Sequence, residues 1–186
     1  MEIEAKLMLP EPDALRRRLH EAAADPLGVL TQTDAYFDTP EGRLRLADAG
    51  LRLRFTAHGP QHPGDGLGSA SLQYKGPAAG DTVLHREEWS LPLAAAADPH
   101  EARSLLHALG YHEVLSFTKR RELWRLAACE VALDTLEDLG HFVEIEGPSE
   151  AAVSAVIDRL GLQGEAALRA SYLEMIARHR GLMPRD

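Results

Sequence analysis

The chain has 186 residues, with 29 acidic against 20 basic side chains and a formal net charge of −9 at pH 7. This acidic balance argues against a generally basic nucleic-acid-binding surface. Hydrophobic residues make up 45% of the chain and charged residues 26%, which is typical of a folded globular protein and unlike a disordered one. One compact domain spanning residues 1–186 is the expected organisation at this length.

The cysteine content and the N-terminus narrow the class further. Cys129 is the only cysteine, so the chain can form no intrachain disulfide and no zinc site built from several thiolates. The N-terminus alternates charged and apolar residues and does not resemble a secretion signal, and no run of about 18 apolar residues occurs. We therefore expect a cytoplasmic protein with neither a membrane nor a nucleic-acid partner; the sequence leaves a homodimer open.

The first half of the chain is predicted to be mostly strands. Residues 2–8 alternate, with charged side chains on one side and apolar side chains on the other. A proline-bounded helix is predicted over about 13–24. Further strands are predicted over 31–38, 50–55, 69–75 and 83–91, and the glycine- and proline-rich segment 58–68 is predicted as a loop.

The second half is predicted to combine three strands with three helices. The strands cover 116–125, 129–136 and 141–146, and the helices cover 99–109, 149–160 and about 171–180. Ser149 is a suitable N-cap for the helix that follows it. The total is eight strands, and their order along the chain predicts an antiparallel α+β domain.

Most of these strands carry charge at every second position. For one strand alone, this alternation is more often a half-exposed surface than a functional site. Its repetition changes the balance, because a closed antiparallel barrel would direct all of these side chains into one lumen. The charged positions are Glu2, Glu4, Lys6, Arg52, Arg54, Lys75, Arg86, Glu88, Lys119, Arg121, Glu144 and Glu146.

The mixture of signs indicates what such a lumen would bind. Buried charges must be balanced by one another, by water or by a ligand. Cations alone would favour an anion, and carboxylates alone would favour a metal ion. Both together are what a polyphosphate with a divalent metal requires, since Mg²⁺ and Mn²⁺ prefer carboxylate and phosphate oxygens and arginine binds phosphoryl groups in bidentate fashion.

Short motifs follow one another in order along the whole chain, from Glu2-x-Glu4-x-Lys6 at its start through Gly50-Leu51-Arg52-Leu53-Arg54 and Glu144-Ile145-Glu146 to Ser171-Tyr172. This series resembles the CYTH superfamily of triphosphate tunnel metalloenzymes. The first is Glu2-x-Glu4-x-Lys6, which is similar to the signature of that family. A lone motif of this kind arises by chance, whereas the ordered series argues against coincidence. The series continues with Tyr36-Phe37-Asp38-Thr39-Pro40, Leu44, Gly50-Leu51-Arg52-Leu53-Arg54, Lys75-Gly76-Pro77, Arg86-Glu87-Glu88, Lys119-Arg120-Arg121, Leu133-Asp134, Leu139-Gly140, Glu144-Ile145-Glu146 and Ser171-Tyr172.

The resemblance implies a fold and a set of site residues. The fold would be an eight-stranded antiparallel β-barrel, open as a tunnel, with helices packed outside. Metal ligands would be Glu2, Glu4, Glu144 and Glu146, with Asp134 and Glu88 as further candidates for positioning a metal ion or water. Triphosphate-binding cations would be Lys6, Arg52, Arg54, Lys75, Lys119 and Arg121, joined by Arg86 from its charged strand face. Arg121 is preferred to Arg120 because it alternates with Lys119.

The same resemblance implies Mg²⁺- or Mn²⁺-dependent attack at a triphosphate, with Glu2, Glu4, Lys6, Glu88 and Asp134 as the catalytic group. With water as nucleophile, the enzyme would hydrolyse inorganic tripolyphosphate, thiamine triphosphate or a nucleoside triphosphate. With the 3′-hydroxyl of ATP, it would be a class IV-type adenylate cyclase that releases cyclic AMP and pyrophosphate.

We favour hydrolysis, because the sequence shows no separate adenine pocket. A noncatalytic polyphosphate- or nucleotide-binding module is the third alternative. Retention of both Glu-x-Glu pairs argues against it, since four extra carboxylates would not help to bind an anion without a metal ion.

Overall fold

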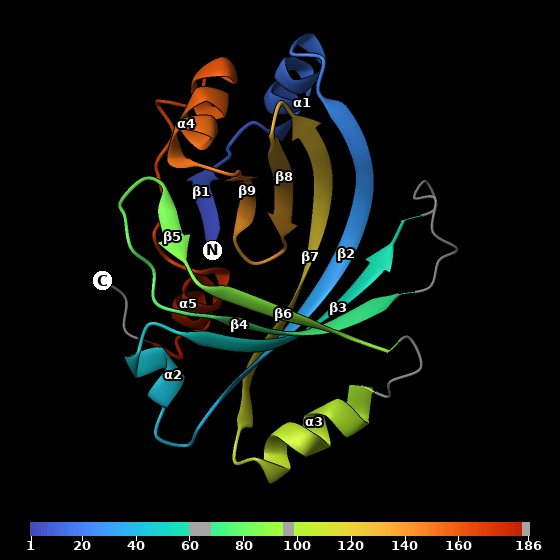
Figure 1. Cartoon of the computed structure of the whole chain (residues 1–186), viewed down its shortest axis with the longest axis vertical. Helices are drawn as coiled ribbons and strands as arrows, with labels where there is room; N and C mark the ends of the chain where they lie inside the picture. Colours follow the sequence, from blue (N-terminus) through green and yellow to red (C-terminus); the bar gives the residue numbers. More distant parts are fainter. Residues whose placement is uncertain (60–67, 95–98, 184–186) are drawn as a thin grey trace.

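One antiparallel sheet curls into a nearly closed barrel (Figure 1). The computed structural model describes residues 1–59, 68–94 and 99–183. Within these ranges, nine strands follow the spatial order β5-β1-β9-β8-β7-β2-β3-β4-β6. Their bounds are β1 (Glu2–Met8), β2 (Asp25–Asp38), β3 (Gly50–His58), β4 (Ser69–Lys75), β5 (Leu84–Arg86), β6 (Glu88–Leu93), β7 (His112–Leu126), β8 (Cys129–Leu136) and β9 (Gly140–Glu146). The predicted α+β barrel is thereby confirmed.

The strand predicted over 83–91 is two strands, so the count is nine rather than eight. β5 pairs with β1, whereas β6 pairs with β4. Only Glu87 separates them, and its carbonyl oxygen accepts a hydrogen bond of 2.9 Å from the backbone N–H of Gly76. Because β5 and β6 are the two edges of the sheet, the chain itself closes the barrel there. The sequence shows one run because the alternation continues unchanged through Glu87.

The outward-facing apolar side chains pack beneath helices. β1, β8 and β9 form the largest core with α1 (Pro12–Glu21) and α4 (Glu150–Arg159), which lie together at one end of the barrel in Figure 1. α3 (Pro99–Ala108) packs elsewhere, with Leu106 against Phe37 and Leu53 of β2 and β3. Burying both sets of apolar side chains leaves the opposite, charged face of each strand directed inward.

Two further helices contribute side chains to the cavities described below. α5 (Tyr172–His179) begins with a capping box between Ser171 and Glu174, and its Tyr172 packs with Phe142 and Phe117 inside the barrel. α2 (Arg43–Leu46), which the sequence did not predict, follows β2. The carboxylate of Asp38 holds that turn by accepting backbone N–H bonds from Thr39, Leu44 and Arg45.

Other element boundaries differ modestly from the predictions. β2 begins at Asp25 and β7 at His112, several residues before the predicted starts. The N-cap role of Ser149 is confirmed, since its hydroxyl accepts a hydrogen bond from the backbone N–H of Ala152. Most of the loop predicted over 58–68 lies outside the described residues. No helix within the described ranges has the length and apolar character needed to cross a membrane.

Candidate active site

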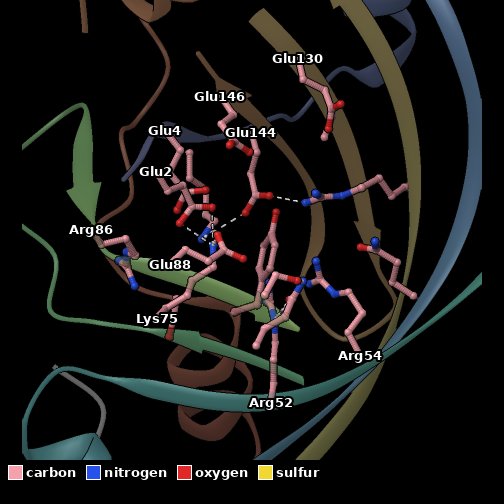
Figure 2. Close-up of a pocket in the computed structure, with 18 of the residues that line it drawn as sticks. Glu2, Glu4, Arg52, Arg54, Lys75, Arg86, Glu88, Glu130, Glu144 and Glu146 are labelled. Carbon is pink, nitrogen blue, oxygen red and sulfur yellow. Dashed lines mark hydrogen bonds and ion pairs between the residues drawn. The ribbon is translucent and has the colours of Figure 1, made fainter. Parts of the chain in front are cut away.

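The inward faces of the strands enclose a cavity of about 530 Å³, here called the ionic cavity (Figure 2). Twelve of the thirteen site residues predicted from the sequence line it, and all but Asp134 are therefore brought together. The register explains the convergence: Lys6 lies directly across from Glu144, and Glu4 across from Glu146. The strand alternation seen in the sequence thus becomes one shared lumen, as the barrel expectation required.

Carboxylates gather on one side of the ionic cavity, where Figure 2 shows Glu2, Glu4 and Glu146 close together. Lys75 is their main counter-ion: its Nζ lies 2.5 and 2.7 Å from the two carboxylate oxygens of Glu2 and 3.5 Å from Glu88. Partial burial and the neighbouring carboxylate of Glu2 raise the pKa of Glu146 to about 7. Negative charge therefore exceeds what the local cations offset.

This acidic group has the donor chemistry for a divalent cation. In the described part of the chain, no three Asp, Glu, His or Cys side chains already converge as a finished metal site. Mg²⁺ does not need one, because it commonly binds through one or two carboxylates plus water and substrate phosphate oxygens. One or two of Glu2, Glu4 and Glu146 could therefore bind an ion whose other ligands are water and phosphate oxygens.

Two arginines line the opposite wall and share one buried counter-ion. Arg54 donates from Nε and Nη2 to the carboxylate of Asp34, both at 2.7 Å, and Arg52 Nη1 approaches the same carboxylate at 3.4 Å. Burial opposes ionisation of Asp34, but the guanidinium groups of Arg52 and Arg54 outweigh it and hold the pKa of Asp34 well below its ordinary range. The two arginines therefore stay fixed and charged.

A second pair of cations comes from β7 and is held by Asp134 of β8. Lys119 Nζ lies 2.9 Å from Asp134 Oδ2, Arg121 donates to both oxygens of the same carboxylate, and the hydroxyl of Tyr172 donates to it at 2.9 Å. Burial and the charge of Arg121 lower the pKa of Lys119 to about 7, against the opposing pull of Asp134.

Asp134 is the one predicted site residue that does not line the ionic cavity. It is 1% exposed, and both of its oxygens are engaged by the side chains just described. In this arrangement Asp134 fixes Lys119 and Arg121, which line the cavity, without lining the cavity itself. Its role at a metal ion stays a prediction.

Lys6 and Arg86 also line the cavity but belong to neither of these two pairs. Lys6 Nζ lies 3.3 Å from Glu144 Oε1 and 4.4 Å from the ring centroid of Tyr172. Arg86 has a buried Nε that makes no hydrogen bond within the described residues. A buried donor without a partner is costly, so Arg86 is suited to an anionic ligand.

The choice of Arg121 over Arg120 agrees with the side-chain directions. Arg121 lines the ionic cavity, where it also pairs with Glu144. Arg120 points to the outer side of β7, where it and Arg16 of α1 bind the carboxylate of Glu122. No bulge between Lys119 and Arg121 reverses the alternation, since these residues pair without a register shift with Gln32 to Leu30 of β2.

Several residues that line the ionic cavity or contact its wall were missing from the sequence-based set, and β2 supplied the clearest overlooked signal. Gln32, Asp34 and Tyr36 occupy alternate positions, and register places Asp34 opposite Arg54 and Tyr36 opposite Arg52. Their spacing of two could have placed them on the charged face. Gln73, Ser90 and Glu130 had no such signal, because isolated polar residues on strands are common. Tyr172, which lies on α5, appeared in the sequence only as part of the Ser171-Tyr172 motif and was assigned no role.

A second cavity of about 410 Å³, here called the apolar cavity, adjoins the first. The described residues that line both are Tyr36, Arg52, Gln73, Lys75, Arg86 and Ser171. Beyond them, the apolar cavity is walled mainly by the turn around α2, the start of β7 and one side of α5, including Leu44, Leu115 and Leu173. A ligand with an anionic part and an apolar part could therefore occupy both.

Comparison with known proteins gives the same architecture. The CYTH domain model matches residues 1–172. Adenylate cyclase CyaB of Aeromonas hydrophila is 31% identical over 147 residues, which cover 77% of this chain and 67% of that protein. The structure of PH1819 from Pyrococcus horikoshii has a TM-score of 0.79 and 26% identity, covering 96% of this chain and 99% of that one.

HpAC1 of Hippeastrum, described as having a dominant triphosphatase activity, shares the fold with a TM-score of 0.70 and 22% identity; the match covers 97% of this chain and 96% of that one. The family match begins at the Glu2-x-Glu4-x-Lys6 strand and extends to Tyr172, the residue that enters the barrel from α5. The chain therefore belongs to the CYTH domain family.

Proposed function

We propose that the chain hydrolyses an organic triphosphate, with Mg²⁺ or Mn²⁺ as cofactor. The observation that carries this proposal is the lining of the ionic cavity. Among the described residues, seven cations and six carboxylates face one lumen. An inorganic anion alone would not account for the carboxylates, and a metal ion alone would not account for the cations. The cations are Lys6, Arg52, Arg54, Lys75, Arg86, Lys119 and Arg121, and the acids are Glu2, Glu4, Glu88, Glu130, Glu144 and Glu146.

In this mechanism the cations bind and orient the phosphate chain. Arg52 and Arg54 face it from one wall and Lys119 and Arg121 from another, so that charge on the phosphoryl oxygens meets fixed donors. Glu2, Glu4, Glu144 and Glu146 would hold the divalent ion, which would supply Lewis-acid polarisation of phosphoryl oxygens.

Glu88 is the residue to which we assign the handling of the attacking water, because its carboxylate lines the same lumen from β6. It would position a water molecule for in-line attack on the terminal phosphorus. The attack forms a new phosphorus–oxygen bond, breaks the phosphoanhydride bond and releases orthophosphate and a diphosphate.

The apolar cavity supports an organic substrate over inorganic tripolyphosphate. It adjoins the cationic wall through Arg52, Lys75 and Arg86, and it has apolar side chains where a headgroup attached to the phosphate chain would lie. Leu115 and Leu173 are examples. Apolar sites with a few convergent polar groups are typical of small-molecule binding. Thiamine triphosphate and nucleoside triphosphates have this combination of parts.

Cyclisation of ATP to cyclic AMP is the second candidate function, favoured by the name of the Aeromonas relative. It requires more than the ionic cavity, since the ribose 3′-hydroxyl must be held against the α-phosphorus. Hydrolysis needs only the residues that line the lumen and a water molecule. The triphosphatase activity described for HpAC1 also supports hydrolysis within the same fold.

The deciding experiment incubates the purified protein and Mg²⁺ or Mn²⁺ with thiamine triphosphate, ATP or tripolyphosphate, and separates the products. We expect orthophosphate from all three, with the highest kcat/KM for an organic substrate. Cyclic AMP and pyrophosphate from ATP, without orthophosphate, would contradict hydrolysis. The Arg54→Ala protein serves as the control for contaminating phosphatases, because its loss of cationic contacts should remove genuine activity.

The pH profile of kcat/KM is expected to be bell-shaped, with its maximum near pH 7. Glu146 must be ionised to hold a metal ion, and its raised pKa of about 7 means that the carboxylate form appears as pH rises through that value. Lys119 must be protonated to bind an anion, and its lowered pKa of about 7 means that the cation is lost over the same range. The profile of kcat/KM reports groups of the free enzyme.

Lys119→Arg provides the check on the alkaline limb. A guanidinium keeps its charge throughout the accessible pH range, so this variant should retain kcat/KM as pH rises above 8. The acidic limb, assigned to Glu146, should remain. An unchanged alkaline limb in Lys119→Arg would show that another group causes it.

A further inference from the structure

Asp34 occupies an unusual place behind the wall of the ionic cavity. Its side chain is 1% exposed and does not line the cavity, yet it contacts the two arginines that do. Arg54 binds both of its oxygens through Nε and Nη2 at 2.7 Å. Arg52 reaches it through Nη1 at 3.4 Å. A carboxylate in this position cannot touch a ligand in the lumen, but it can decide how the arginines are presented to one.

Two further side chains also fix the guanidinium of Arg52. Its Nε donates to Gln73 Oε1 at 2.7 Å, and its Nη1 donates to the hydroxyl of Tyr36 at 3.1 Å. Within the described residues, no hydrogen bond engages Nη2 of Arg52 or Nη1 of Arg54. Each guanidinium is thus held through two of its three nitrogens, Arg52 through Nε and Nη1 and Arg54 through Nε and Nη2, and keeps the third nitrogen for a ligand.

We infer that Asp34 is a positioning residue for turnover, which holds Arg52 and Arg54 in one arrangement at the expense of ground-state affinity for the anion. This inference rests on the proposed function, since it assumes that the arginines contact the phosphate chain. It adds a residue that the sequence-based set did not contain. Asp34 acts through the two arginines and never contacts the substrate.

The physical argument has two parts with opposite signs. The negative charge of Asp34 reduces the positive potential that the arginine pair offers to an anion, so its removal should strengthen the attraction. The same carboxylate fixes the guanidinium groups, and donors preorganised around the phosphoryl group stabilise the transition state. Without Asp34, the arginines would be free to follow the substrate in its ground state. A loss of turnover without a loss of binding is the distinctive consequence.

Asp34→Asn tests this split, because asparagine keeps the size of the side chain and removes its charge. We expect kcat to fall about tenfold or more, in keeping with the sensitivity of catalysis to small displacements of positioned groups. We expect the Kd for tripolyphosphate, measured by calorimetry in EDTA where no turnover occurs, to be equal to or lower than that of the unaltered protein. Arg54→Ala, which removes the other partner of the same ion pair, should raise that Kd.

Glu122→Gln is the matched control. Glu122 is also a buried carboxylate that binds two arginines, Arg16 and Arg120, but it lies on the outer side of the barrel. The Glu122→Gln variant should have a lower thermal stability, with little change in kcat or in the Kd for tripolyphosphate. If Asp34→Asn fails to fold, Asp34→Glu keeps the charge but moves the carboxylate, and it should lower kcat with Kd within about threefold of the unaltered protein.

Three results would overturn the inference. The first is a Kd in Asp34→Asn that rises as much as in Arg54→Ala, which would make Asp34 part of binding alone. The second is an unchanged kcat in a folded Asp34 variant. The third is an unaltered protein that does not bind tripolyphosphate. An unaltered protein that binds tripolyphosphate but hydrolyses no triphosphate would instead contradict the proposed function, and the Kd comparison would still test how Asp34 affects anion binding.

Discussion

Glu4→Gln and Glu146→Gln are each expected to abolish metal-dependent turnover while leaving the barrel folded. Both carboxylates lie in the acidic group of the ionic cavity, and each substitution keeps the shape of the side chain but removes a negative charge. Loss of an outer-shell partner of a metal ligand typically costs about 10- to 100-fold, so loss of a ligand itself should exceed about 100-fold in kcat/KM. Steady-state rates across a Mg²⁺ or Mn²⁺ titration would measure the loss.

The folded state of Glu146→Gln is expected to be at least as stable as that of the unaltered protein at neutral pH. Glu146 already tends toward its protonated form there, because its pKa is raised to about 7, so a neutral amide is a close substitute. Glu87→Gln is the matched control: Glu87 is exposed and immediately precedes Glu88, and its variant should retain activity. Full activity in both Glu4→Gln and Glu146→Gln at saturating metal would remove the proposed metal role of these residues.

Arg52→Ala and Arg54→Ala are expected to weaken the binding of triphosphate more than that of orthophosphate. A chain of three phosphoryl groups can contact this arginine pair and the Lys119–Arg121 pair at once, whereas orthophosphate can be held by either. Truncating one member of a buried, hydrogen-bonded charge pair costs about 2–5 kcal/mol, which corresponds to roughly 30-fold or more in Kd. Calorimetric Kd values for tripolyphosphate and orthophosphate give the comparison.

The control for the arginine variants comes from β7. Arg120 is half-exposed and lies outside the barrel, so Arg120→Ala removes a positive charge without altering the ionic cavity. It should leave both dissociation constants nearly unchanged. Equal losses for tripolyphosphate and orthophosphate in Arg52→Ala and Arg54→Ala would argue against a clamp that spans several phosphoryl groups.

The sequence predicted which charged side chains face the lumen wherever charge recurred at period two on a strand. The positions of Arg52, Arg54, Lys119 and Arg121 followed from that rule, because one buried face forces the other face inward once the barrel closes. The rule also determined the choice between Arg120 and Arg121. It could not show which side chains pair with one another, because the sequence of one strand does not reveal its register with a strand that is distant along the chain.

The residues that the sequence missed or placed differently share one cause. Asp34 and Asp134 are acids whose function depends on a neighbouring strand: one lies opposite Arg54 and the other opposite Arg121. The alternation along each strand places the acid on the inward face, but neither strand shows by itself which arginine the acid will pair with. The division of residues 84–93 between β5 and β6 was equally hidden, because both pieces keep the same alternation and only their different partners separate them.

The central claim is that the inward-facing charges bind a triphosphate together with a divalent ion. A crystal structure with Mn²⁺ and a non-hydrolysable tripolyphosphate analogue tests it most directly. We predict an anomalous manganese peak beside Glu4 and Glu146, with phosphoryl groups between the Arg52–Arg54 and Lys119–Arg121 pairs. Manganese and phosphate bound only on the outer surface of the barrel, with an unliganded lumen, would contradict the claim.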